Sequence, residues 1–215
     1  MMPPVVLPSV GPRVAPLDGK AKVATIGISV AMATGVLLVV AQLLRRRELV
    51  RYRDGELVSR QRIDQVDQWV HNAAIIFLLG VVVGGACFIP WFHRAYKNVA
   101  SWHTTRLSTG WAIGGWFLPF ANLVVPYLVA KDLATNSGNM KTSPSNYLPA
   151  WWACVVIGAL GQYGMRGELE SVDDYIRFDT VGPIFAAIWI TGGACLIALT
   201  REITRTQHAS WFRDV

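Results

Sequence analysis

Charged residues are scarce in this chain, and they are missing in long blocks. Only 16% of its 215 residues are charged and 53% are hydrophobic, whereas soluble globular proteins carry about 25% charged residues. A helix that crosses a bilayer needs about 20 mainly apolar residues. Four stretches that contain no charged residue meet this need, namely residues 23–44, 72–92, 148–165 and 180–200. The composition therefore excludes an ordinary soluble domain and predicts an all-α, polytopic transmembrane helical bundle.

The sequence also lacks the side-chain patterns on which catalysis and metal binding depend. The three cysteines fall inside predicted spans without metal-ligand spacing, and the four histidines are scattered without a His or carboxylate partner at helical spacing. The glycine-rich stretch GWAIGG has neither the lysine nor the preceding strand of a phosphate-binding loop. We therefore expect no enzyme activity, no cofactor and no metal.

The net charge of +6 lies mainly in segments that flank the predicted spans, such as RRRELVRYR. Anionic lipid headgroups and the excess of basic residues in cytoplasmic loops explain these segments more simply than nucleic acid does, so no nucleic-acid partner is expected. The loop at residues 166–179 is acidic, whereas the tail after Thr200 is basic. This contrast predicts a multi-pass protein of the inner membrane with a cytoplasmic C-terminus.

The chain divides into a membrane domain between two tails. Residues 1–22 are proline-rich, with five prolines among the first sixteen residues, and are expected to be disordered. Residues 23–205 form the predicted helical membrane domain, and residues 206–215 the cytoplasmic tail.

Two patterns predict how the helices are arranged. Apolar residues recur at helical spacing between Leu57 and Val70, which favours an amphipathic helix that leads into the second span. Small residues recur four apart, as at Gly80 and Gly84, and such spacing lets helix backbones approach closely in lipid. Packing within one bundle is the simpler interpretation, with homodimerisation as the alternative.

The stretch GWAIGGWFLPFANLVVPY, residues 110–127, is apolar but unsuited to a regular helix. Pro119 and Pro126 remove two backbone donors, and the glycines weaken the helix further. A broken helix is tolerated in lipid only where protein covers it or where it faces a wet cavity. Residues 110–130 are therefore predicted to form either a re-entrant hairpin or a kinked fifth span. In both, the Asn122 amide is expected to bond backbone groups that the prolines leave free.

A set of aromatic, glycine, proline and polar residues surrounds this stretch. They are Trp91, Arg94, Asn98, Gly110, Trp111, Gly114, Gly115, Trp116, Pro119, Asn122, Pro126, Asp132, Trp151 and Trp152. In these residues the chain resembles the bacterial membrane proteins of the family called domain of unknown function 4328. The resemblance covers residues 20–205. The resemblance leads us to expect a tryptophan at position 134, but the sequence has Ala134 there. The resemblance implies no assigned activity, but it implies a cytoplasmic, often proline-rich N-terminus before a membrane bundle.

The number of spans is left open between four and five. The distribution of Lys and Arg slightly favours five spans with the N-terminus outside. The cytoplasmic N-terminus that the resemblance implies, together with the Pro and Gly content of residues 110–130, favours four spans plus a hairpin. We take the second arrangement as the prediction.

Two functions fit this architecture. The first is a non-enzymatic scaffold or regulatory partner in the inner membrane, in which the motif set packs helices or docks a membrane-protein partner. The alternative is a small passive channel or carrier lined by residues 110–127, because the spans lack the ionisable groups of a driven pump. The oligomeric state is left open.

Basic residues after the second span predict a contact with the lipid bilayer. If that span continues as a helix, Trp91 and Trp111 lie at the headgroup level. Arg94, Lys97 and Arg106 then hold anionic lipid, at about 1 kcal/mol per basic residue. Two alternatives are ordinary positive-inside anchoring and a structural role in which Arg94 and Asn98 cap the broken helix.

Overall fold

The computed structural model describes residues 14–137, 146–164 and 170–211, and these residues form no strand. The predicted all-α class is confirmed. The elements are α1 (Asp18–Arg53), α2 (Arg60–Trp102), α3 (Trp111–Gly114), the 3-10 helix η1 (Ala121–Leu123), α4 (Val125–Asn136), α5 (Tyr147–Gly164) and α6 (Val172–Trp211).

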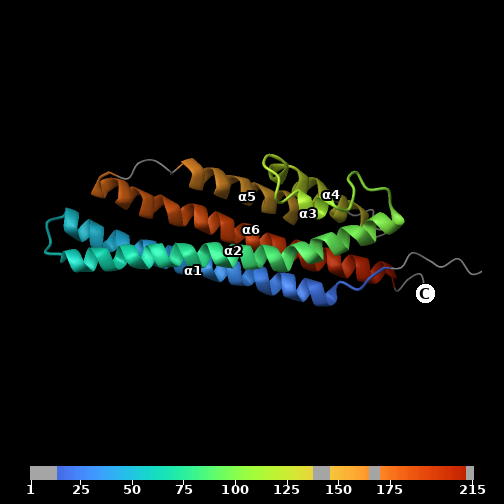
Figure 1. The fold of residues 1–215 in the computed structure, drawn as a ribbon, viewed down its shortest axis with the longest axis horizontal. Helices are drawn as coiled ribbons and strands as arrows, with labels where there is room; N and C mark the ends of the chain where they lie inside the picture. Colours follow the sequence, from blue (N-terminus) through green and yellow to red (C-terminus); the bar gives the residue numbers. More distant parts are fainter. Residues whose placement is uncertain (1–13, 138–145, 165–169, 212–215) are drawn as a thin grey trace, which may run out of the picture.

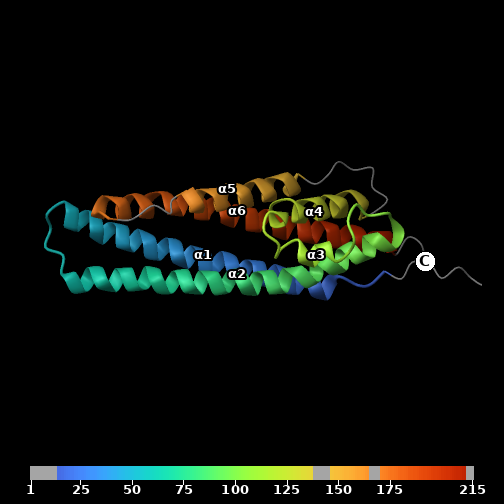
Figure 2. The same cartoon turned by 45° about the horizontal axis from the view of Figure 1, so that its top comes forward.

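Three of the helices are long and apolar enough to cross a membrane, namely α1, α2 and α6. They contain 36, 43 and 40 residues, so they are about 54 to 65 Å long, whereas the hydrocarbon core is about 30 Å thick. Each therefore extends beyond the apolar stretch that the sequence predicted for it. The remaining predicted span lies in α5, which is apolar but shorter. Figures 1 and 2 show an elongated bundle in which α5 lies along α6.

Close backbone contact holds α1 against α2. A Cβ atom added at Gly84 would lie 3.1 Å from the carbonyl oxygen of Gly27 and 3.2 Å from the Cβ of Ala31. A Cβ at Gly80 would collide with the side chain of Thr34. The small residues therefore serve packing within one chain, as the simpler interpretation of their spacing predicted.

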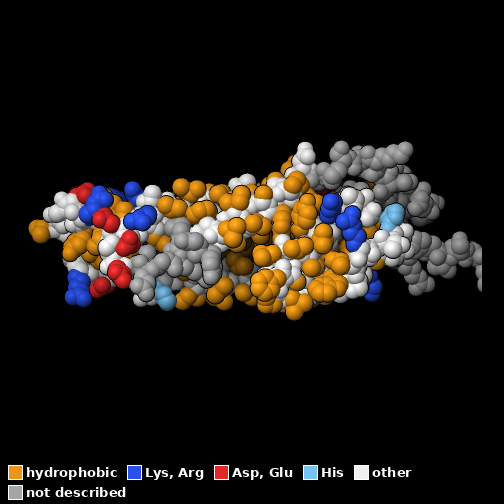
Figure 3. All heavy atoms as spheres, turned by 90° about the horizontal axis from the view of Figure 1, so that it is seen from above, with side chains coloured by type: hydrophobic (Ala, Val, Ile, Leu, Met, Phe, Trp, Pro, Cys, Tyr) orange, Lys and Arg blue, Asp and Glu red, His pale blue; other side chains and the backbone are white. Residues whose placement is uncertain are grey.

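Apolar side chains remain exposed along the middle of the helices. Figure 3 shows hydrophobic side chains over the middle of one face and charged side chains toward its two ends. On α1 and α2 the exposed hydrophobic residues include Val23, Ile26, Val30, Val36, Leu37, Val40, Ile75, Ile76, Leu78, Leu79, Val82 and Val83. An apolar belt of this kind is what contact with lipid tails requires, and a soluble protein rarely exposes one.

The amphipathic helix predicted before the second span is the first part of α2. Val66 and Val70 are buried, and the hydroxyl of Ser59 caps the helix by accepting a hydrogen bond from the backbone N–H of Arg62 at 3.2 Å. Leu57 does not belong to this helix, because it lies before the cap and is fully exposed.

The helical region is longer than the predicted membrane domain at both ends. Leu17 is buried, and α1 begins at Asp18, inside the predicted proline-rich tail. At the other end α6 continues into the predicted cytoplasmic tail. The rest of the two predicted tails, residues 1–13 and 212–215, lies outside the described residues.

Candidate functional site

Most of the predicted motif residues gather at one end of the bundle. This motif end consists of residues 14–28, 88–137 and 196–209, which are the start of α1, the ends of α2 and α6, and the segment with α3 and α4. The start of α1 and the end of α6 meet there, because Nδ1 of His208 lies 3.5 Å from a carboxylate oxygen of Asp18. Figure 2 shows α3 and α4 beside this end of the bundle.

Trp91 is a core residue of the motif end. Its Nε1 donates a hydrogen bond to the hydroxyl of Thr204 at 3.1 Å, and its ring lies 5.5 Å from that of Phe88. Trp116 packs edge-on against Phe88 and Phe92, at 5.8 and 5.9 Å. Trp91 is therefore a buried packing residue, because its single polar atom finds a partner inside the bundle and the ring gains aromatic contacts; its predicted position at the headgroup level stays a prediction.

Asn98 joins three parts of the chain. Its amide nitrogen donates to the carbonyl oxygen of Ala15 at 2.9 Å and to Oε1 of Gln207 at 3.0 Å, and its oxygen accepts from the backbone N–H of Ala15 at 3.2 Å. The amide nitrogen of Gln207 then donates to the hydroxyl of Ser137 at 3.0 Å. Asn98 thus holds the segment before α1 rather than capping a broken helix, and Gln207 extends the network to the end of α4.

Asp132 joins the two ends of the segment that was predicted to be a hairpin or a kinked span. These two ends, near residues 106 and 132, are called the base of the segment. Its Oδ2 accepts hydrogen bonds from the hydroxyl of Tyr96 at 3.1 Å and from the backbone N–H of Arg106 at 3.0 Å. Nε of Arg106 lies 3.3 Å from the other carboxylate oxygen, and burial raises the pKa of the Tyr96 hydroxyl, which remains a donor. Because residues 106 and 132 meet, the chain between them leaves α2 and returns to it.

A sharp turn separates the two limbs of this segment. Phe120 has a φ of 65°, a left-handed conformation that is uncommon for residues other than glycine. A Cβ atom at Gly115 would collide with the side chain of Val125 and would lie 2.9 Å from the carbonyl oxygen of Trp111. Glycine therefore lets the limbs touch, and Pro126 is tolerated because it lies in the first turn of α4.

Two of the other motif glycines face open space. A Cβ atom at Gly110 or Gly114 would meet no atom of the described residues within 4 Å. Among these residues, neither glycine therefore makes a close contact of the kind that Gly115 makes.

The turn presents apolar side chains outward. This hairpin tip, residues 117–124, has five exposed large hydrophobic residues, which are Phe117, Leu118, Phe120, Leu123 and Val124. Asn122 lies among them, is exposed, and makes no side-chain hydrogen bond with any described residue. The prediction that its amide satisfies backbone groups near the prolines is therefore wrong, because η1 directs the side chain away from the fold.

The paired tryptophans of α5 connect that helix to α4. Trp151 is buried and Trp152 partly buried, with ring centroids 5.3 Å apart. The ring of Trp152 lies 6.1 Å from that of Tyr127 in α4. Both residues are therefore packing residues, and they join α5 to the motif end.

The three basic residues predicted to contact anionic lipid have different surroundings. Arg106 forms an ion pair with Asp132. Lys97 is exposed, and Arg94 is half-buried with a buried Nε that has no partner among the described residues. They therefore do not form a uniform cluster of free charges.

A second polar cluster, which the sequence did not reveal, lies at the opposite end of the bundle. This charged end consists of residues 45–69 and 171–180. Nε and Nη2 of Arg45 each lie 2.7 Å from a carboxylate oxygen of Asp179, and Nη1 lies 3.2 Å from Asp67. Burial raises the pKa of Asp179, whereas the hydrogen bonds and positive charge of Arg45 oppose this rise.

The sequence contains one indication that Arg45 and Asp179 pair, namely their positions at the ends of predicted spans. Arg45 directly follows one predicted span, and Asp179 directly precedes another. Charged residues at two span boundaries can meet when both helices end at the same depth. The sequence alone does not show which boundaries lie together, and so the pair was missed.

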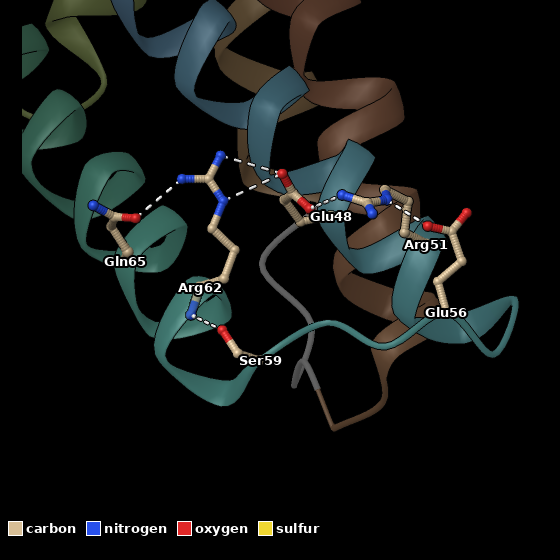
Figure 4. Close-up of polar contacts among 6 residues, drawn as sticks. All are labelled: Glu48, Arg51, Glu56, Ser59, Arg62 and Gln65. Carbon is tan, nitrogen blue, oxygen red and sulfur yellow. Dashed lines mark hydrogen bonds and ion pairs between the residues drawn. The ribbon is translucent and has the colours of Figure 1, made fainter.

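A network around Glu48 continues the charged end (Figure 4). Oε1 of the buried Glu48 accepts from Nε and Nη2 of Arg62 at 3.3 and 3.2 Å, and Oε2 accepts from Arg51 at 3.0 Å. Arg51 also reaches Glu56, at 2.6 Å. The network ties the end of α1 to the start of α2.

A cavity of about 200 Å³ lies between the helices in the apolar part of the bundle. Phe77, Phe185 and Trp189 contribute to its wall, and Gln42 is its polar residue. Gln42 is buried and makes no hydrogen bond with any described residue. In the described part of the chain, no group of three or more His, Cys, Asp or Glu residues could hold a metal ion.

The chain matches the family described as Domain of unknown function (DUF4328) over residues 53–205, more than half of its length. It belongs to this family. In this DUF4328 protein the match begins where α1 ends, later than the start that the sequence resemblance suggested, and it includes the closed base and the hairpin tip. No curated protein and no solved structure matches the chain.

Proposed function

We propose that this DUF4328 protein is a non-enzymatic membrane scaffold or regulatory protein whose hairpin tip docks a membrane-protein partner. Its helices α1, α2, α5 and α6 cross the inner membrane, and the segment with α3 and α4 is a re-entrant hairpin. The contact between residues 106 and 132 supports the hairpin, because a segment whose ends meet returns to the side from which it enters. Both termini then lie in the cytoplasm.

The hairpin tip is the observation that carries the docking function. Phe117 is 72% exposed and Phe120 is 85% exposed, and the unpartnered amide of Asn122 lies between them and α4. Lipid tails suit the two phenyl rings but leave the amide without a hydrogen bond, which is costly in hydrocarbon. A protein surface that buries the rings and bonds the amide suits the whole tip.

The base beneath the tip is suited to hold it in one conformation. Asp132 fixes the two limbs, Gly115 lets them touch, and Trp116 packs into the aromatic core. A surface that is ordered before binding loses less conformational entropy when a partner binds. The buried residues of the motif therefore support docking without contacting the partner.

A photo-crosslinking residue tests the docking function directly. We expect the crosslinker at Phe120, in the full chain in its native membrane, to give a discrete protein product that Asn122→Ala diminishes. The control is the crosslinker at Leu79, which is exposed in the middle of α2 and should give lipid adducts alone. Lipid adducts alone at both positions would overturn the proposal.

Cysteine labelling separates docking from the pore that the sequence left open. A cysteine at Val124, in a chain without Cys87, Cys154 and Cys195, is expected to be protected from a water-soluble thiol reagent. Labelling as rapid as that of a cysteine at the exposed Gly55 would favour a wet, pore-lining segment instead.

A further inference from the structure

A groove with basic walls lies at the motif end between the start of α1 and the end of α6. It has a volume of about 380 Å³. Lys22 on α1 and Arg201 and Arg205 on α6 supply its charges, and Thr25 and Ile26 lie beside them. The groove contains none of the basic residues that the sequence singled out for lipid contact.

The positive charge of the groove is only partly neutralised by the described residues, because three basic residues face one acidic residue. Lys22, Arg201 and Arg205 form no ion pair with any described residue. The groove has one acidic residue, Asp18, which lies 3.5 Å from Nδ1 of His208. Arg201 and Arg205 are four residues apart on one helix, where like charges repel each other. A bound anion would relieve this repulsion.

The groove lies where the apolar belt ends. Lys22 directly precedes the uncharged stretch 23–44, and Arg201 directly follows the uncharged stretch 180–200. Ile26 and Val30, one and two turns further along α1, are 64% and 42% exposed. Positive charge at the boundary, next to exposed apolar surface, matches a molecule with an anionic head and an apolar tail.

We infer that this groove binds the headgroup phosphate of an anionic phospholipid. The guanidinium groups of Arg201 and Arg205 suit phosphate oxygens because they can donate two parallel hydrogen bonds, and Lys22 adds a third charge from the facing helix. The acyl chains extend over Ile26 and Val30. Basic pockets between transmembrane helices bind lipid headgroups in this way. This site is independent of partner docking at the hairpin tip.

Native mass spectrometry of the full chain in detergent tests the inference by titration with phosphatidylglycerol and, separately, phosphatidylcholine. We expect preferential binding of phosphatidylglycerol. The double variant Arg201→Gln/Arg205→Gln should weaken that binding about 25-fold, since each of the two basic residues contributes about a factor of five. The matched control Arg47→Gln/Arg60→Gln removes the same charge from exposed residues at the charged end and should leave binding within about twofold of the wild type.

Three results would overturn the inference. Equal binding of the two lipids would remove the role of headgroup charge. An equal loss in the two double variants would show that net charge, and not the groove, attracts the lipid. Displacement of phosphatidylglycerol by inorganic phosphate at comparable concentration would identify a free phosphate site instead of a lipid site.

Discussion

Arg45 and Asp179 are 134 residues apart in the chain and meet through two hydrogen bonds of 2.7 Å each. Asp179 is fully buried, and Arg45 also reaches Asp67 of α2. Through these two residues, α1, α2 and α6 are joined where their apolar stretches end. At the motif end, Asn98 of α2 and Gln207 of α6 bond to each other, and Asn98 also bonds to Ala15 in the segment before α1. Polar residues thus fix both ends of an apolar bundle.

Removal of one partner of the Arg45 pair should destabilise the fold strongly. Asp179→Ala leaves a buried guanidinium without its main partner and is expected to lower the free energy of unfolding by about 3–5 kcal/mol. Denaturant unfolding in detergent micelles measures this loss. The double variant Arg45→Met/Asp179→Leu should recover most of it. A loss no larger than that of Asp173→Ala, at an exposed carboxylate, would contradict this role.

Asn98 should stabilise both the fold and the segment before α1. Asn98→Ala removes the hydrogen bonds to the backbone of Ala15 and to Oε1 of Gln207 and is expected to cost about 1–3 kcal/mol of unfolding free energy. Limited proteolysis should then cleave the chain near Ala15 more rapidly. Lys97→Ala, one residue away and exposed, is the control. Equal cleavage rates in the two variants would argue against the tether.

Two glycines five residues apart in α2 should respond oppositely to alanine. Gly85→Ala should stabilise the helix by up to about 1 kcal/mol, because the added Cβ meets no described residue within 4 Å and alanine is the better helix former. Gly80→Ala should destabilise it, because the Cβ collides with the side chain of Thr34. Thermal unfolding of the two variants in the same detergent gives the comparison. Stabilisation by both would show that α1 and α2 lie further apart than described.

Gln42 should be replaceable by an apolar side chain. Because its amide lines the cavity and makes no hydrogen bond with any described residue, Gln42→Leu is expected to raise the free energy of unfolding by about 1 kcal/mol. Denaturant unfolding is again the measurement, with Gln68→Leu at an exposed position of α2 as the control. Destabilisation would indicate that the amide bonds a molecule held in the cavity.

The sequence predicted the features that depend on local composition. Long uncharged stretches identified the helices that now form the bundle, and four-residue spacing identified Gly80 and Gly84 as close-packing residues. Prolines and glycines identified the break near Pro119. These features could be predicted because the physical cause of each lies within one segment. The causes are the desolvation of charge, the close approach of backbones and a missing backbone donor.

The features that depend on long-range contacts could not be predicted in the same way. The sequence does not show whether Trp91 is exposed or packed inside the bundle, and only its contact with Thr204 on α6 shows that it is buried. The sequence favours a structural hydrogen-bonding role for the Asn122 amide. Only the turn at Phe120 shows that this side chain points outward. The closure of the hairpin base by Asp132 likewise requires knowing that residues 106 and 132 meet.

The sidedness of the two chain ends tests the central claim most directly. Topology reporters placed before Met1 and after Val215, with a third inserted at Gly55 between α1 and α2, give the three positions needed. If four helices cross and the segment with α3 and α4 returns to its own side, both terminal reporters are cytoplasmic and the reporter at Gly55 is on the opposite side. Terminal reporters on opposite sides of the membrane would contradict the account, because that segment would then be a fifth crossing.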